Sequence, residues 1–328
     1  MLENADTGVG FELVMSSVTT NILKSGSLST LHEGMQNGDW KLQDQSAENA
    51  TADIYDYLYY RTWFARQNYG NFAKTIQRFI HPDATVLELG CGTGTVSNLV
   101  GSQCNCMDFS EKMLSIAKTK VQGSCVQADM EHLPYVDKTF DVVFVNSALH
   151  HFPSLDKIIQ EINRILKKDG HLLIQEPNSH SIKKDALLKV LAYGIRKIGA
   201  KKYPDVSSLE VRPSDHHAPL LPSKLITSIT TNGFGIESLR HRYYASYILS
   251  GFDSKLALIV GKLLDRSYVW KMKQGYMLVV IARKGQSIEK VSLPLAAFGV
   301  IVAILYCYDY VKDRKNPVWY DPMPTPDI

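Results

Sequence analysis

The sequence predicts an α/β protein built on a doubly wound, mostly parallel, seven-stranded sheet. From residue 84 onward, short apolar runs alternate with helical stretches, the pattern of a parallel sheet that is covered on both faces. The first of these runs ends in a glycine-rich turn that leads into a helix. A length of 328 residues, of which 45% are hydrophobic, is sufficient for one large domain with additions.

Seven runs have the length and apolar content of strands. The helix between the fourth and fifth is marked by an apolar stripe at helical spacing from Leu155 to Leu166. A further helix is expected over 222–231, and one or two amphipathic helices over 50–80. The expected strands are 85–89, 103–108, 124–128, 140–146, 170–175, 236–244 and 275–283.

The chain divides into a leader, a main domain and a C-terminal segment. Residues 1–50 are rich in Ser, Thr, Asn, Gly and Gln, so we expect them to be weakly ordered. The main domain runs over 51–285, with helical insertions at about 178–221 and 245–273. Both insertions should lie over the carboxyl edge of the sheet, where they would form a lid that selects the substrate.

Composition restricts the compartment and the partners. Lys and Arg number 36 against 33 Asp and Glu, and this balance is too even to favour nucleic acid. The five cysteines are an odd set without the spacing of a disulfide framework or a zinc site, which indicates a reducing compartment. Because the N-terminus lacks the features of a secretory signal, we expect a cytoplasmic protein.

The glycine turn is the clearest chemical motif. It reads Gly90-Cys91-Gly92-Thr93-Gly94, and glycines there permit positive φ and a close approach of the backbone to a ligand. The free N–H groups at the start of the following helix favour an anion. The third glycine comes two residues after the second, whereas a dinucleotide site requires three, so this spacing disfavours a nicotinamide oxidoreductase.

Two carboxylates follow at the ends of the next strands. Asp108 comes 18 residues after Gly90, where it can accept hydrogen bonds from both hydroxyls of a ribose. Asp129 ends the third strand, where it can bind an adenine amino group while Met130 packs on the ring. Together with the turn, these residues predict a site for a nucleoside with an anionic group.

The stretch from Val86 to Gln175 resembles the class I S-adenosylmethionine-dependent methyltransferase domain, a Rossmann-like fold. Within that family it is similar to the methyltransferases of ubiquinone and menaquinone biosynthesis. Four strings carry the resemblance: VLELGCGTG, MDFSEKMLSIAK, QADMEHLPYVDKTFDVVFVNSALHHF and EINRILKKDGHLLIQEP. Tyr55 and Asp56 resemble a tyrosine-aspartate pair that closes over the cofactor in this family.

The resemblance implies methyl transfer from S-adenosylmethionine to a small-molecule or lipid-like acceptor. A cofactor-binding regulatory or assembly protein that no longer catalyses remains the alternative. Glu88 also has a second interpretation, since a carboxylate at a strand end can tie down a loop. The expected cofactor residues are Tyr55, Glu88, Gly90, Cys91, Gly92, Gly94, Asp108, Phe109, Asp129, Met130 and Asn146.

Methyl transfer from a sulfonium is an in-line displacement and requires no metal. The protein holds the nucleophile at attack distance and excludes water. A general base is needed only for an acceptor that loses a proton, and His150 or His151 is the candidate by its place after the fourth strand. Packing of the loop, or orientation of the cofactor, is the alternative role. His216 and His217 are further candidates in the first insertion.

We expect the C-terminal segment, 286–328, to consist of a hydrophobic helix and a polar tail. Residues 291–308 contain no charged side chain, a length at the lower edge of what spans a bilayer. We expect membrane association through this run, and a helix buried against the domain or a partner is the alternative. An anchor would favour a lipophilic acceptor, because such a molecule is concentrated in the bilayer.

Overall fold

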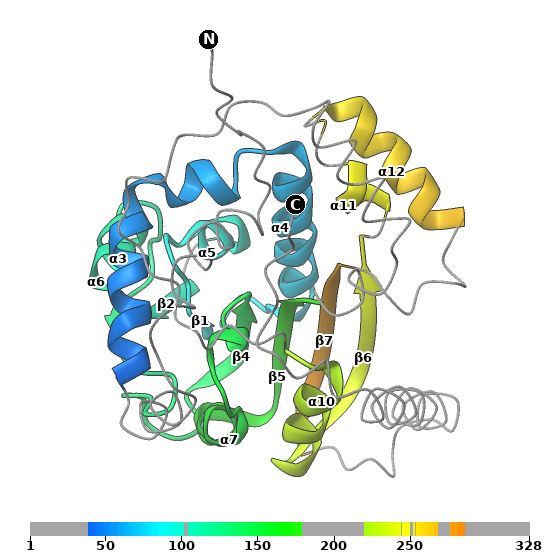
Figure 1. Cartoon of the computed structure of the whole chain (residues 1–328). Helices are drawn as coiled ribbons and strands as arrows, with labels where there is room; N and C mark the ends of the chain where they lie inside the picture. Colours follow the sequence, from blue (N-terminus) through cyan, green and yellow to red (C-terminus); the bar gives the residue numbers. More distant parts are fainter. Residues whose placement is uncertain are drawn as a thin grey trace, which may run out of the picture.

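The computed structural model describes residues 39–101, 104–178, 220–243, 245–249, 252, 254–267 and 276–285. Within these residues, seven strands form one sheet in the order β3-β2-β1-β4-β5-β7-β6 (Figure 1). The strands are β1 (Val86–Leu89), β2 (Cys104–Asp108), β3 (Cys125–Gln127), β4 (Phe140–Asn146), β5 (Leu166–Pro177), β6 (Phe234–Arg242) and β7 (Met277–Lys284).

The sheet is mostly parallel, as the sequence predicts. β1 lies between β2 and β4 and runs parallel to both, whereas β7 is antiparallel to β5 and β6. All four residues of β1 are buried, which explains why this strand is a continuous apolar run around Glu88. Since the strand order reverses between β1 and β4, the carboxyl ends of these two strands border a crevice suited to a ligand.

Helices cover both faces of the sheet. One core lies between the sheet and α7 (Asp156–Ile165) with α10 (Pro222–Thr231), and the other between the sheet and α4 (Trp63–Ile76) with α5 (Thr95–Val100). In α7 the predicted stripe is fully buried through Ile158, Ile159, Ile162 and Ile165. Burial of each such side chain stabilises the fold by about 1.5–3 kcal/mol. The doubly wound arrangement is therefore confirmed.

The second insertion is helical in its described parts, α11 (Ala245–Leu249) and α12 (Lys255–Ser267). Two short helices, α6 (Glu111–Ala117) and η2 (Leu149–His151), follow β2 and β4, and η1 (Gln77–Phe79) precedes β1. The first insertion from residue 179 to 219, with His216 and His217, lies outside the described residues, as does everything from residue 286 onward. Among the helices that are described, none is both long and apolar enough to cross a bilayer.

The N-terminal boundary differs from the prediction. Helix α3 extends over Asp39–Tyr59, so residues 39–50, which the sequence places in a weakly ordered leader, belong to the folded domain. The helix has a row at four-residue spacing, Trp40, Asp44, Glu48 and Ala52, in which Glu48 is partly exposed and the other three residues are buried. Because half of this row is acidic, a search for apolar periodicity does not detect it.

Candidate functional site

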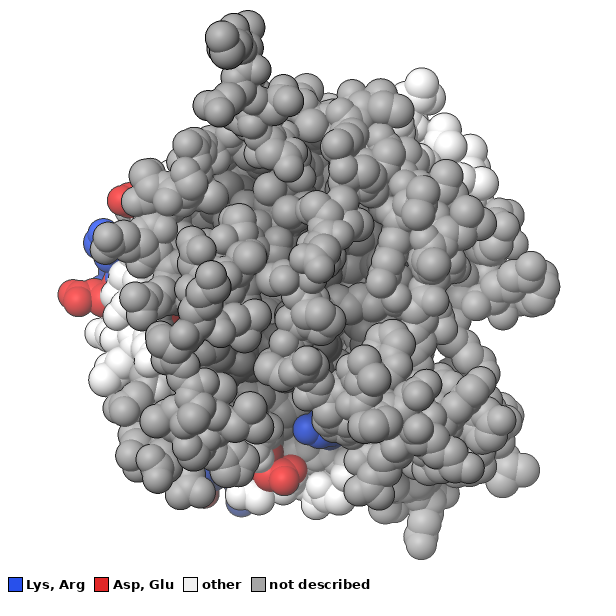
Figure 2. Space-filling view, in the orientation of Figure 1, with Lys and Arg blue, Asp and Glu red and all other residues white. Residues whose placement is uncertain are grey.

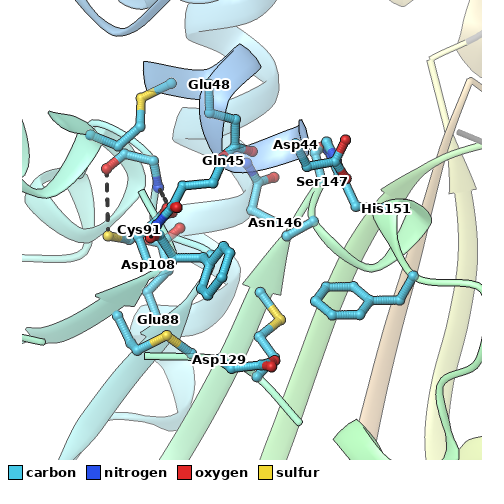
Figure 3. A pocket seen from close by; sticks show the side chains of 18 of the residues that line it. Asp44, Gln45, Glu48, Glu88, Cys91, Asp108, Asp129, Asn146, Ser147 and His151 are labelled. Atoms are coloured by element: carbon cyan, nitrogen blue, oxygen red, sulfur yellow. Dashed lines mark hydrogen bonds and ion pairs between the residues drawn. The ribbon is translucent and has the colours of Figure 1, made fainter. Parts of the chain in front are cut away.

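The predicted site residues gather around one open cleft at the carboxyl edge of the sheet (Figure 3). Its open space, including the mouth and the adjoining solvent, amounts to about 830 Å³. The ends of β1, β2 and β4 form its floor, and α3 forms the opposite wall. Of the predicted residues, the cleft is lined by Tyr55, Glu88, Gly90, Cys91, Gly92, Asp108, Phe109, Asp129, Met130, Asn146 and His151.

The glycine turn has the backbone conformation that the sequence predicts. Gly90, Gly92 and Gly94 have φ angles of 66°, 53° and 73°. Gly92 faces the cleft, and a β-carbon there would have only the Tyr55 ring within 4 Å, at 3.7 Å. Gly94 does not line the cleft. A β-carbon there would lie 2.9 Å from that of Ala117 and 2.8 Å from Val121 Cγ2, so this glycine permits the packing of α6.

Asp108 is held in place by two backbone amides. Its Oδ2 accepts a hydrogen bond from Gly92 N at 2.7 Å, and its Oδ1 accepts one from Ser110 N at 2.8 Å. Burial raises the pKa of this carboxyl group, although the amides oppose the shift. Each oxygen accepts one of these bonds and keeps further lone-pair capacity, so the carboxylate can still accept bonds from a ribose diol.

Glu88 ties down a loop, which is the second of its two expected roles. Its Oε2 accepts hydrogen bonds from the backbone N and the hydroxyl of Ser97, at 2.9 and 2.5 Å, which fastens α5 to the end of β1. The side chain is 1% exposed, and burial raises its pKa well above the ordinary value against the effect of the Ser97 bonds. Glu88 also lines the cleft, and its role in cofactor binding stays a prediction.

Asp129 is paired with Lys41, a residue that the sequence does not single out. The Lys41 ammonium lies 2.5 Å from Asp129 Oδ2 and also contacts Glu131. Burial acts to raise the pKa of Asp129, but the bonds from Lys41 and from the Glu131 amide outweigh it and hold that pKa below its usual range. Asp129 is therefore ionised in the cleft, where it can accept the bond from an adenine amino group.

Helix α3 supplies the wall of the cleft that faces the sheet. Figure 3 shows Asp44, Gln45 and Glu48 projecting from it toward the strand ends. Gln45 donates to the carbonyl oxygen of Phe109 at 2.7 Å, which links the helix to the loop after β2. At the other end, Asp56 accepts bonds from the hydroxyls of Thr93 and Thr95, so the Tyr55-Asp56 pair fastens α3 to the glycine turn.

Carboxylates from two sides of the cleft lie close enough to influence each other. Burial raises the pKa of Glu48 well above its ordinary value, and the negative charges of Asp108 and Asp44 add to this effect. Glu88 adds a further buried carboxyl group, while Lys41 is engaged by Asp129 and Glu131. A site with this surplus of acidic groups favours a cationic ligand.

The two histidines after β4 occupy different places. His150 is not among the residues that line the cleft, and its Nδ1 lies 2.8 Å from Oε2 of Glu176, which is buried near the end of β5. His151 lines the cleft, and its Nδ1 lies 3.5 Å from Asp44 Oδ2. The geometry therefore favours His151 over His150 as the histidine that reaches a bound acceptor.

Two of the residues that line the cleft are aromatic and pack against each other. Trp40 and Phe152 pack edge to face with ring centroids 5.5 Å apart, one from α3 and the other after η2.

Asn146, at the end of β4, is 7% exposed and accepts a hydrogen bond from Gln175 at 2.8 Å. Helix α3 supplies five lining residues that the sequence did not single out: Trp40, Lys41, Asp44, Gln45 and Glu48. The other lining residues that it did not single out are Tyr60, Met107, Met113, Ala128, Ser147, Ala148 and Phe152.

Residues 87–174 match a family model described as a methyltransferase domain. Demethylmenaquinone methyltransferase of Lactobacillus johnsonii is 37% identical over 103 residues, 27% of this chain and 42% of that protein. Sterol 24-C-methyltransferase of Schizosaccharomyces pombe is 33% identical over 144 residues, 36% of this chain and 37% of that protein. This chain thus spans about two-fifths of these two relatives. A crystal structure of an S-adenosylmethionine-dependent methyltransferase from Thermotoga maritima has 16% identity and a TM-score of 0.47, covering 73% of this chain and 100% of that one.

Proposed function

Because residues 87–174 match a model of a methyltransferase domain, we propose that this chain transfers a methyl group from S-adenosylmethionine to a small-molecule or lipid-like acceptor. One observation carries the proposal: the cleft combines a glycine turn at positive φ with carboxylates at the ends of β1 and β2 and after β3. A nucleoside with a charged amino-acid tail requires this combination of close backbone approach and hydrogen-bond acceptors.

The described residues fit the cofactor in shape and in charge. Asp108 would hold the ribose diol and Asp129 the adenine amino group, with Met130 against the ring. The sulfonium and the ammonium group of the cofactor are both cationic, and the carboxyl groups of Glu48 and Asp44 lie in the same cleft, where a bound cation favours their ionised form. Gly92 leaves open space beside Tyr55 for the ligand.

When bound, S-adenosylmethionine supplies an electrophilic methyl group on its sulfonium sulfur. The chain contributes by positioning, because α3 and the strand ends hold the two sides of the cleft at a fixed separation. Trp40 and Phe152 reduce the access of water to the site. For an acceptor that loses a proton, His151 accepts it, and Asp44 stabilises the resulting imidazolium.

The names of the two relatives, which point to a quinone and a sterol, support a lipophilic acceptor for this chain. We propose that the insertions at 178–221 and 245–273 form the acceptor lid. Membrane association through 291–308 and a cytoplasmic location of the catalytic domain belong to the same proposal, and carbonate extraction of the full-length protein tests the former. Release of all the protein into the soluble fraction would exclude a spanning segment.

Transfer itself can be tested without knowledge of the acceptor. The protein is incubated with methyl-labelled S-adenosylmethionine and a cell extract, which is then separated into lipid, aqueous small-molecule and protein fractions. We expect label in the lipid fraction with the wild type and little with Asp108→Asn. Tight binding of the donor without label in any fraction would favour a regulatory protein instead.

A further inference from the structure

Helix α12 carries an apolar face that points out of the molecule. Its exposed residues follow helical spacing: Leu256, Ile259, Val260, Leu263 and Leu264 have exposed fractions of 71%, 47%, 40%, 59% and 41%. At 100° per residue they cover roughly 140° of the helix circumference. We call this set the α12 face. In a water-soluble helix, such a continuous stripe normally faces the core.

The α12 face cannot turn inward, because the opposite side of the helix is fixed to the domain. Leu258 is buried in a cluster with Phe64, Tyr247 and Tyr276. Gly261 lies against α11 so closely that a β-carbon there would be 2.6 Å from Ser246 Cα. Asp265 accepts a hydrogen bond from the Ser246 hydroxyl at 2.5 Å. The outward orientation of the stripe therefore follows from the packing of the fold.

Cations border the α12 face where it meets α4. Trp63, 41% exposed, lies at the start of α4 with the Lys255 ammonium 6.0 Å and the Arg66 guanidinium 5.7 Å from its ring. Lys262 reaches Gln67 on α4. The acid of α12, Asp265, is on its inner side. Figure 1 places α12 at the outer edge of the molecule, and the described atoms in that part of Figure 2 are white, which marks uncharged residues.

We propose that the α12 face, with Trp63 and its cationic border, docks on the surface of an anionic lipid bilayer. An amphipathic helix that lies in the membrane interface has this arrangement, with apolar side chains among the acyl chains and Lys, Arg and Trp at the headgroups. Charge decides against a second copy of the chain as the occupant. An antiparallel two-fold contact through this face would bring Lys255, Lys262 and Arg66 of both copies to the same side, whereas anionic headgroups neutralise them.

Docking in this way would be independent of methyl transfer and of the C-terminal run at 291–308. It would hold the catalytic domain against the bilayer through α12 and the beginning of α4. Tyr60, which lines the cleft, is three residues before Trp63, so the docking surface adjoins the wall of the cleft. An acceptor dissolved in the membrane would then be close to the cleft.

Vesicle co-sedimentation of the full-length chain tests the proposal. The vesicles contain either phosphatidylcholine alone or phosphatidylcholine with phosphatidylglycerol. The double substitution I259D/L263D should lower the partition coefficient on the anionic vesicles roughly a hundredfold, about tenfold for each side chain removed from the acyl region. Val136→Asp is the matched control, because Val136 is 77% exposed on a different part of the surface, and its binding should equal that of the wild type.

A charge reversal tests the cationic border. Lys255→Glu should weaken binding to the anionic vesicles while leaving the weaker binding to phosphatidylcholine unchanged. Unaltered circular dichroism and unaltered affinity for S-adenosylhomocysteine show that each variant is folded. The proposal is overturned if I259D/L263D binds anionic vesicles as well as the wild type, or if the wild type does not bind them. It is equally overturned if light scattering shows a wild-type dimer that I259D/L263D separates.

Discussion

The substitutions Gly92→Ala and Gly94→Ala distinguish two roles of the glycine turn, which are ligand binding and the packing of helix α6. Both residues have positive φ, 53° and 73°, but a side chain would meet different surroundings at each. At Gly92 it would meet the Tyr55 ring at an ordinary contact distance of 3.7 Å, within the cleft. At Gly94 it would overlap with Ala117 and Val121, away from the cleft lining. We therefore expect Gly92→Ala to impair ligand binding and Gly94→Ala to impair folding.

The expected magnitudes follow from these contacts. The left-handed backbone costs an alanine about 1–2 kcal/mol at either position. Gly94→Ala adds about 1–3 kcal/mol of overpacking, because the Ala117 backbone, 3.1 Å away, cannot rotate aside. At about 3 °C per kcal/mol, the melting temperature should fall by about 3–6 °C for Gly92→Ala and by about 6–15 °C for Gly94→Ala.

Thermal unfolding and calorimetry with S-adenosylhomocysteine measure the two effects separately. In the folded protein, Gly92→Ala should weaken binding about tenfold or more, since the added methyl group occupies ligand space. Gly94→Ala should retain the wild-type affinity at a temperature where it is folded. Equal loss of stability in both variants, or equal loss of affinity, would refute this division of roles.

The remaining predictions concern single side chains. Asp108→Asn should weaken binding of S-adenosylmethionine by about 10- to 100-fold in calorimetry, because a charge-assisted hydrogen bond is replaced by a neutral one; unchanged affinity would exclude ribose binding by this residue. Lys41→Met removes the cation that holds the pKa of Asp129 low. That pair stabilises the fold at pH values above the ordinary Asp pKa and loses its effect as the pH falls through the lowered pKa, so the variant should melt roughly 3 °C below the wild type near neutral pH. The difference should shrink toward about pH 3, and a difference independent of pH would contradict the ion pair. Glu48→Gln should lower the affinity for cationic S-adenosylmethionine more than that for neutral S-adenosylhomocysteine, whereas an equal loss of both affinities would show that Glu48 does not sense the sulfonium. Once an acceptor that loses a proton is known, His151→Gln should reduce turnover more than His150→Ala with cofactor binding intact in both; normal turnover in His151→Gln would remove it as the base.

The strands could be predicted because a buried parallel sheet leaves a strong pattern. β4 has the predicted bounds, and β1, β2 and β3 differ from theirs by one residue at one or both ends. β5 is longer at both ends, from Leu166 to Pro177, because its extensions pair with β4 and β7, and the sequence of one strand does not reveal its partners. The same limit applies to the position of β7 between β5 and β6.

The site residues that could be predicted from the sequence are those located at or just after the end of a strand. The glycine turn, Asp108 and Asp129 come together because neighbouring parallel strands end at one edge of the sheet. The inner end of the leader, which lies in helix α3, escaped prediction because its inward row contains Asp44 and Glu48, and a search for apolar periodicity does not count acidic residues as inward-facing. The pair of Lys41 with Asp129 joins residues 88 positions apart, and no local pattern encodes it.

The choice between His150 and His151 depends on the backbone of one short turn. The two residues are adjacent in η2, and their rings are 4.4 Å apart, yet one faces Glu176 and the other faces Asp44. Composition and spacing treat the two histidines alike. Their separation becomes visible only when β5 and α3 supply the two carboxylates.

Isothermal titration of the folded full-length chain with S-adenosylmethionine and with S-adenosylhomocysteine tests the central claim most directly. The acidic cleft predicts one molecule of either compound per chain, with release of protons on binding the sulfonium, because a cation lowers the raised pKa of Glu48. That release appears as a binding heat that depends on the buffer. The account would be contradicted if neither compound gave a binding heat in two different buffers while circular dichroism showed that the protein was folded.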